Sequence, residues 1–368
     1  MQQPQSVKLT TSVLSLARLG KSIVIASLLM LVACSGGSDS ERLWQRYHQA
    51  LSDSLSEQPV PVQPTPLPVM PRSDALRLEI ERFSVGLLDT LRLDHCRLSQ
   101  LIAQRNSALG IAQSPQARLR YELDSLKAID ECLQNAQSAV DNDPRIHSML
   151  TDARAHKVQT LPLYIDQLLT RGDSFRQALR AHSAGHASDD SSDLEAALAA
   201  LQYLQQLFTQ AVAGHFGQLD LEPYNQHLRT LAQSDALPRQ WRTMHQTEAW
   251  LRAINQQLAG AAEQLECTST SASGSPAQSQ RLQTLMQTVY LAQVEPRLTR
   301  WNADQQLITS QLNKLSAFSV QPEWQQYINQ LIGSDSHAEQ VRALTVEHSR
   351  LWQQLRAQCQ LTTDPLDS

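Results

Sequence analysis

Residues 238–265 read PRQWRTMHQTEAWLRAINQQLAGAAEQL. Met244, Leu251, Leu258 and Leu265 recur every seven positions, and Trp241, Ile254 and Ala261 fill the second position of the apolar seam. A seven-residue apolar repeat is typical of helices that pack side by side as in a coiled coil. Proline is favoured in the first turn of a helix. The stretch therefore predicts a long helix that begins at Pro238 and packs against neighbouring helices.

Two further helices are expected towards the C-terminus. The first spans 281–315 and is expected to kink at Pro296, which lacks the amide hydrogen that a straight helix needs. The second spans 337–359, and a shorter helix over 323–332 lies in the connection. We expect the three long helices to pack antiparallel and coiled-coil-like, and the whole body to be an all-α multi-helix bundle.

Helical spacing also covers the middle of the chain. After a brief extended stretch, it predicts a first long helix over 88–109 that ends at Gly110. Pro115 and Pro144 each open a further helix. The remaining helices are expected at 144–158, 161–182, 193–213 and 221–234, with a loop at 182–192. We expect one α-helical domain over 73–368, or two sub-bundles that divide near 215–237.

The first 33 residues predict an export signal. Three basic residues precede the apolar run Ile23–Ala33, which is too short to cross a bilayer core of roughly 30 Å. The sequence Leu31-Val32-Ala33-Cys34 resembles the lipobox of bacterial lipoproteins. The resemblance implies cleavage before Cys34, diacylglycerol on its sulfur and an acyl chain such as palmitate on the new amine, enough for stable anchoring. The alternative is a secreted protein without lipid.

The residue after the cysteine bears on location. In lipoproteins of this type an aspartate there favours retention in the inner membrane, whereas this chain has Ser35. The resemblance therefore implies the periplasmic face of the outer membrane, with the inner membrane less favoured. The expected partners are the membrane, through the N-terminal lipid, and a protein of the cell envelope.

Residues 34–72 connect this anchor to the body. The apolar spacing from Leu43 to Leu55 predicts a short helix that packs on the body or lies near the lipid surface. Six prolines between Pro59 and Pro71 exclude a helix and predict an extended segment. At roughly 3.1 Å per residue it would reach about 40 Å. It is either a stiff spacer or a strap that lies across the domain surface.

Composition and charge narrow the function. Aromatic residues make up only 5% of the chain, and the periodic segments are rich in Leu, Ala and Gln, as in helical bundles. The net charge is −5, without a basic stripe. With the export signal, this argues against nucleic acid as a partner.

The five cysteines predict disulfides. With one used for the lipid, four remain in an oxidising compartment, and three pairings are open. Cys96 and Cys132 lie at comparable distances from the Gly110 turn on successive helices, so an antiparallel hairpin would bring them together. Cys267 and Cys359 would fall at the same end of an up-down-up arrangement. We therefore expect the pairs Cys96–Cys132 and Cys267–Cys359.

A search for catalytic motifs finds no Gly-x-Ser-x-Gly elbow, phosphate-binding glycine loop or His-Glu-x-x-His sequence. His182 and His186 have a spacing that could hold a metal on a helix, but Gly185 and polar neighbours favour a loop. His95 and His348 lie on apolar helix faces and are expected in the core. We assign no catalytic residue, metal or other cofactor.

Two local features have both a functional and a structural interpretation. Arg105-Asn106-Ser107, near a helix end, could bind an anion or a partner carboxylate, although capping and a salt bridge explain the same residues. Four tryptophans of the C-terminal helices could line an apolar groove, although packing is the favoured interpretation. They are Trp241, Trp250, Trp301 and Trp352.

The segments Arg105–Gly110, Arg120–Leu123 and Trp352–Cys359 carry a resemblance to a known family. It consists of uncharacterised lipoproteins of Gram-negative bacteria built on one domain of unknown function. The resemblance covers most of the mature chain and implies no activity or catalytic residue. We therefore expect a non-enzymatic scaffold or interaction protein of the envelope. The alternative is a ligand- or lipid-binding helical protein, and a hydrolase is less favoured.

Overall fold

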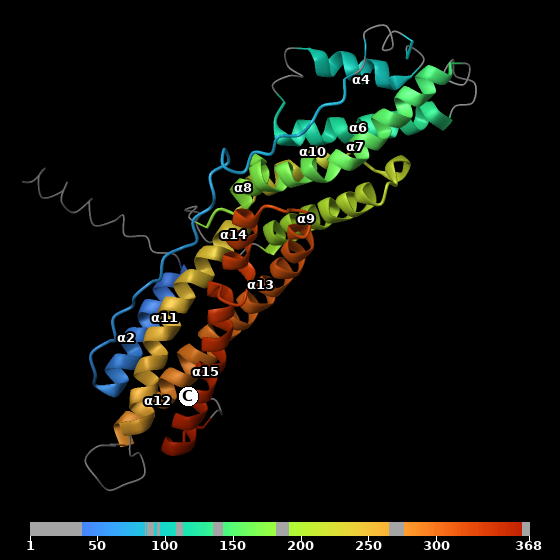
Figure 1. Cartoon of the computed structure of the whole chain (residues 1–368). Coiled ribbons are helices and arrows are strands. Elements are labelled where there is room, and N and C mark those ends of the chain that lie inside the picture. Colours follow the sequence, from blue (N-terminus) through green and yellow to red (C-terminus); the bar gives the residue numbers. More distant parts are fainter. Residues whose placement is uncertain are drawn as a thin grey trace, which may run out of the picture.

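The computed structural model describes residues 39–84, 86, 92–93, 96–107, 113–134, 143–181, 191–264 and 276–362. The described residues are mostly helical and contain no strand, which confirms the predicted all-α multi-helix bundle. The elements are α2 (Asp39–Leu55), α4 (Arg97–Asn106), α6 (Pro115–Gln134), α7 (Pro144–Arg171), α8 (Asp173–Ala178), α9 (Ser191–Val212), η1 (Phe216–Gln218), α10 (Tyr224–Gln233), α11 (Ala236–Gln264), α12 (Pro276–Leu285), η2 (Met286–Val294), α13 (Glu295–Ser316), α14 (Pro322–Ile332) and α15 (His337–Cys359). Figure 1 shows a long body with α4, α6 and α7 at one end and α2, α12 and α15 at the other.

The predicted seven-residue repeat forms the core of the second end. Met244, Leu251 and Leu258 of α11 are buried and share a hydrophobic cluster with Val341 and Leu355 of α15. The short N-terminal helix belongs to the same cluster, which its buried apolar side chains enter. They are Leu43, Trp44, Tyr47, Leu51 and Leu55. Helix α2 thus packs on the body, one of the two positions expected for it.

The helix predicted over 281–315 is interrupted before its proline. Residues Met286–Val294 form a π-helical stretch, and Pro296 lies in the first turn of α13. A proline at that position loses no hydrogen bond of α13, because the first turn has no partner for its amide groups. The helix therefore changes type before Pro296, where the wider turns of the π-helix connect α12 to α13.

Two predicted helix boundaries were wrong. The helices expected at 144–158 and 161–182 are one helix, α7, which continues through Pro162 to Arg171. Leu161, Ile165 and Leu168 are buried, and this packing outweighs the cost of about 3 kcal/mol for an internal proline. The helix expected at 88–109 begins only at Arg97, because Cys96 has an extended backbone and occupies the N-cap.

The largest hydrophobic cluster joins α6, α7, α8, α9, α10 and α14. Helices α11 and α13 reach both large clusters: Trp241 belongs to this one and Met244 to the second, while Ile308 belongs to this one and Leu298 to the second. The two ends of the molecule are therefore connected by continuous helices. The division into sub-bundles near 215–237 stays a prediction.

Residues 57–84 run along the body without regular secondary structure, as Figure 1 shows in blue. In the proline-rich part, His245 Nε2 lies 2.5 Å from the carbonyl oxygen of Thr65, and Arg176 Nη2 donates to the carbonyl of Pro71 at 2.7 Å. Leu67 and Met70 pack against the large cluster. This segment therefore lies as a strap on the domain surface.

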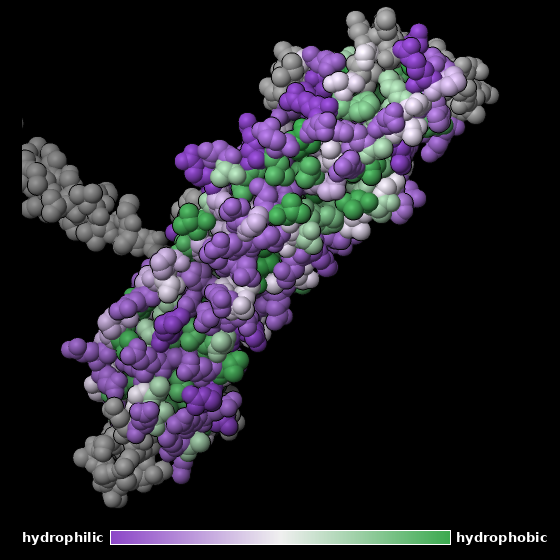
Figure 2. Space-filling view, viewed as in Figure 1, coloured by the Kyte–Doolittle hydropathy of each residue, from purple (hydrophilic) through white to green (hydrophobic). Residues whose placement is uncertain are grey.

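The face of the molecule in Figure 2 is mostly hydrophilic, with apolar residues scattered among polar ones. None of the described helices is long and apolar enough to cross a membrane.

Candidate functional site

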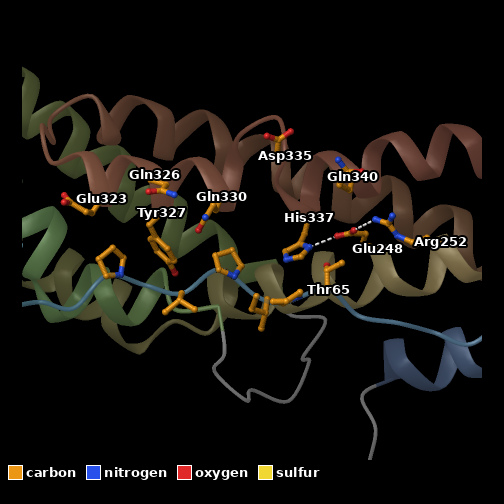
Figure 3. A pocket seen from close by; sticks show the side chains of 15 residues that line it. Thr65, Glu248, Arg252, Glu323, Gln326, Tyr327, Gln330, Asp335, His337 and Gln340 are labelled. Atoms are coloured by element: carbon orange, nitrogen blue, oxygen red, sulfur yellow. Dashed lines mark hydrogen bonds and ion pairs between the residues drawn. The ribbon is translucent and has the colours of Figure 1, made fainter. Parts of the chain in front are cut away.

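A cavity of about 720 Å³ lies beneath the strap. Figure 3 shows the strap on one side and side chains from α11, α14 and α15 on the other. Glu248 pairs with Arg252, and its Oε2 lies 2.5 Å from His337 Nδ1. Burial raises the pKa of Glu248, but the hydrogen bonds from His337 and Arg252 outweigh that effect and lower it. These three side chains satisfy one another, and Glu323 and Asp335 give the rest of the lining a negative charge.

A second cavity, of about 340 Å³, has a very different charge. Five arginines line it, and Glu79 is the only acid among its described lining residues. We call it the arginine groove, defined by Arg77, Arg82, Arg105, Arg118 and Arg171. The lining carries an excess of four positive charges in a chain whose net charge is −5. The sign of this charge makes an anion the expected ligand.

One face of α7 builds the groove. Residues 156, 160, 164, 167 and 171 follow helical spacing, which aligns them on one side of the helix. From this face His156 Nε2 lies 3.1 Å from the carbonyl oxygen of Glu81, and Arg171 Nε donates to the carbonyl of Ser73 at 2.9 Å. Between these contacts, the Gln167 side chain bonds the extended segment twice.

The side-chain amide of Gln167 forms two hydrogen bonds with the backbone of the segment that runs along α7. Its Nε2 donates to the carbonyl of Leu76 at 2.8 Å, and its Oε1 accepts from the amide of Leu78 at 3.3 Å. The extended segment is thereby held along α7, and Arg77 and Arg82 are placed at the cavity. Of the alternating residues expected to be extended, Leu76 ends a turn, and Leu78 and Ile80 lie without regular secondary structure.

Arg118, near the start of α6, is a partly buried cation of the groove, with a side chain 17% exposed. Its guanidinium carbon lies 5.3 Å from the ring centre of Tyr121 and 5.1 Å from that of Tyr164. Its Nη2 lies 2.7 Å from Glu122 Oε1 and 3.1 Å from the Tyr164 hydroxyl. Its Nη1 is buried without a hydrogen-bond partner among the described residues. A buried charged donor of this kind is costly to leave unpaired, and a ligand oxygen would satisfy it.

Repulsion between the positive charges of the groove disfavours the charged form of its arginines. Burial, and then the like charge of Arg77, lowers the pKa of Arg171. An anion between them would relieve this repulsion, and guanidinium groups bind phosphate and carboxylate with paired hydrogen bonds. The groove can therefore hold an acidic group.

The sequence-predicted site residues fall into several places. Arg105 and Asn106 line the cavities at this end of the body, whereas the Ser107 hydroxyl caps α4 by donating to the carbonyl of Gln104 at 2.7 Å. The capping interpretation is thus confirmed for Ser107, while anion binding by Arg105 stays a prediction. His348 is fully buried in the core, as expected.

The four tryptophans pack rather than line a groove. Trp241 and Trp352 are buried, and Trp250 and Trp301 lie partly buried against the second cluster. Cys34, His95, His182 and His186 lie outside the described residues. Within the part that is described, no three His, Cys, Asp or Glu side chains group as metal ligands.

One predicted disulfide is confirmed. Cys96 and Cys132 are bonded, with their Cα atoms 5.8 Å apart, and join the start of α4 to the end of α6. This bond holds α4, which carries Arg105, against the rest of the groove. Cys359 is also disulfide-bonded, while its predicted partner Cys267 lies outside the described residues. The pairing of these two stays a prediction.

Arg77, Arg82, Arg118 and Arg171 were not predicted as site residues. They come from three elements and share no local motif. One signal was present in the sequence: a row of polar residues at helical spacing on α7, which otherwise buries apolar side chains. Such a row indicates a face that contacts something polar.

The described residues thus form an all-α body with a groove lined mainly by arginines. The chain matches the family model "Protein of unknown function (DUF3080)" over residues 44–363, and it belongs to that family. No curated protein and no solved structure matches it.

Proposed function

We propose that this protein is a lipid-anchored protein of the cell envelope that binds an anionic ligand in the arginine groove. The observation that carries the proposal is Arg118, whose buried Nη1 lacks a partner among the described residues at a cavity lined by four more arginines. The sequence favoured a scaffold first and a ligand-binding protein second. The charge of the groove supports the second function.

The anchoring part rests on the lipobox residues before Cys34. Only four residues separate Cys34 from Asp39, where α2 begins, and α2 is packed into the body. At about 3.5 Å per residue the lipid would lie within roughly 18 Å of the start of α2. A lipid on Cys34 would therefore hold the whole body close to the membrane, and Ser35 favours the periplasmic face of the outer membrane.

The anchor predicts the outcome of Cys34→Ala. The wild type should be cleaved before Cys34 and show the added mass of acyl chains, because three chains bind a membrane stably. The variant should keep its first 33 residues and lack that mass, as intact-mass spectrometry of membrane fractions will show. Ser35→Ala serves as the control and should be processed normally. An unlipidated wild type that begins at another residue would refute the anchor.

The groove predicts binding of inorganic phosphate, measured by isothermal titration calorimetry at low ionic strength. Arg118→Gln should weaken binding about ten- to hundredfold, since one charge-assisted bond contributes roughly 1.5–3 kcal/mol. Arg77→Gln with Arg82→Gln, on an exposed segment, should also weaken it without affecting the fold.

Arg350→Gln is the matched control, because it removes the same charge from an exposed site on α15. It should leave phosphate affinity unchanged. Wild type that shows no phosphate binding at millimolar concentration, or equal weakening by the control, would show that the groove is not an anion site.

A further inference from the structure

A cavity of about 370 Å³ adjoins the arginine groove. The two cavities share Arg82, Arg105, Arg118 and Tyr164 among their lining residues. One molecule could therefore contact the arginines and extend into the second cavity. Together they reach the size of pockets that hold small organic ligands.

The lining of the adjoining cavity changes in character away from the arginines. Leu98, Ile129 and Ala153 belong to the hydrophobic cluster around the Cys96–Cys132 bond, and all three line the cavity. Ile102 and Phe83 are partly buried against the same cluster and line it too. Apolar side chains from the core of this end of the molecule thus line the cavity beside the arginine groove.

The polar groups at the boundary are mostly paired. Lys157 Nζ lies 2.6 Å from Glu122 Oε2 and 5.0 Å from the ring centre of Tyr121. Burial raises the pKa of Tyr121, so its hydroxyl stays neutral at ordinary pH. Arg118, with its unpaired Nη1, therefore lies between the arginine groove and the apolar part of the adjoining cavity.

We propose that the ligand is an anionic amphiphile, with a phosphate or carboxylate head in the arginine groove and an alkyl chain in the adjoining cavity. This inference rests on the proposed function, because the head must bind for the chain to be placed. The head would form charge-assisted hydrogen bonds, and the chain would leave water for the surface formed by Leu98, Ile102 and Ile129.

The test compares ethyl, butyl and octyl phosphate below their micellar concentrations, by calorimetry. The protein is the mature chain from Ser35 without lipid, since every residue of the three hydrophobic clusters lies after Asp39. Affinity should rise about fourfold for each methylene buried. Octanoate should bind more tightly than octyl phosphate if the head is a carboxylate, and octyl phosphate should bind more tightly if it is a phosphate.

Two variants separate the head from the chain. Arg118→Gln should weaken every alkyl phosphate by a similar factor. Ile102→Asn, at a half-buried position, should reduce the gain from ethyl to octyl and leave ethyl phosphate unchanged. Octyl glucoside and octyltrimethylammonium, which lack the acid group, should bind at least tenfold more weakly than octyl phosphate.

The outcomes distinguish the two proposals. If ethyl phosphate binds and octyl phosphate binds no better, the amphiphile inference is overturned and the anion site stands. If neither binds, the proposed function itself fails. Equal binding of octyl glucoside would show a nonspecific apolar surface and would also overturn the inference.

Discussion

Asp166→Ala is expected to lower the free energy of unfolding by about 4 kcal/mol. Asp166, on α7, is 1% exposed and accepts hydrogen bonds from the segment between α13 and α14. Its Oδ2 accepts from the Ser319 hydroxyl and the Val320 amide, both at 2.8 Å, and its Oδ1 accepts from Gln321 Nε2. Alanine would remove the acceptor of the Ser319 hydroxyl and the Val320 amide and leave Gln321 Nε2 with only the Thr170 hydroxyl, 3.2 Å away. Hydrogen bonds to a charged acceptor contribute about 1.5–3 kcal/mol each, so their combined loss is large.

Urea unfolding followed by circular dichroism measures this effect. Asp166→Asn is the matched control, since its amide keeps one oxygen for Ser319 and Val320 and has nearly the same volume. We expect it to cost about half as much or less. A typical point substitution destabilises a protein by about 1 kcal/mol. An alanine variant that loses no more than this would show that the Asp166 carboxylate does not hold the α13–α14 connection in place.

Lowering the pH from 7 to 4 is expected to remove about 3 kcal/mol of stability through His348 alone. Asn255 Nδ2 donates to the carbonyl of Leu344 at 2.9 Å, so its Oδ1 accepts from His348 Nδ1 at 2.6 Å. His348 Nε2 must then accept from the Tyr47 hydroxyl at 2.9 Å, and that hydroxyl accepts from Trp352 Nε1 at 2.7 Å. The neutral imidazole satisfies every partner, and a second proton would break the bond from Tyr47.

The direction of this pH dependence follows from the histidine pKa. Burial lowers the pKa of His348 from 6.5 to about 3. Between these values the unfolded chain binds a proton that the folded chain does not. Stability due to this group is therefore full above pH 6.5 and falls as the pH decreases, by about 1.4 kcal/mol per pH unit.

A comparison with His348→Gln isolates this histidine, because glutamine does not titrate and the other groups are common to both proteins. The cost of the substitution at pH 7 should shrink by about 3 kcal/mol at pH 4, as measured by urea unfolding at each pH. If the free energy of unfolding fell equally with pH in both proteins, His348 would not be a buried neutral imidazole.

The same network explains why α2 is part of the body. Tyr47 comes from α2, and its partners His348 and Trp352 lie one turn apart on α15, about 300 residues later in the chain. The apolar spacing of α2 predicted a helix with one buried face. It could not show that this face would meet α11 and α15.

The sequence by itself determined the helices in which apolar residues recur over many turns and whose first residues carry start signals. The repeat over 238–265 and the spacing over 337–359 depend on neighbouring residues alone, and Ser336 caps α15 by accepting from the amide of Glu339. It also predicted the Cys96–Cys132 bond, because a hairpin fixes which residues of two successive helices face each other.

Only the tertiary structure decided where α7 continues and which residues form the groove. Pro162 is a local signal for a break, yet burial on both sides of it outweighs that signal. The arginines of the groove are spread from Arg77 to Arg171 and come together only because Gln167 and Arg171 hold the extended segment against α7. Helical spacing is read within a few residues, whereas a charge cluster depends on contacts between segments far apart in the chain, which periodicity does not encode.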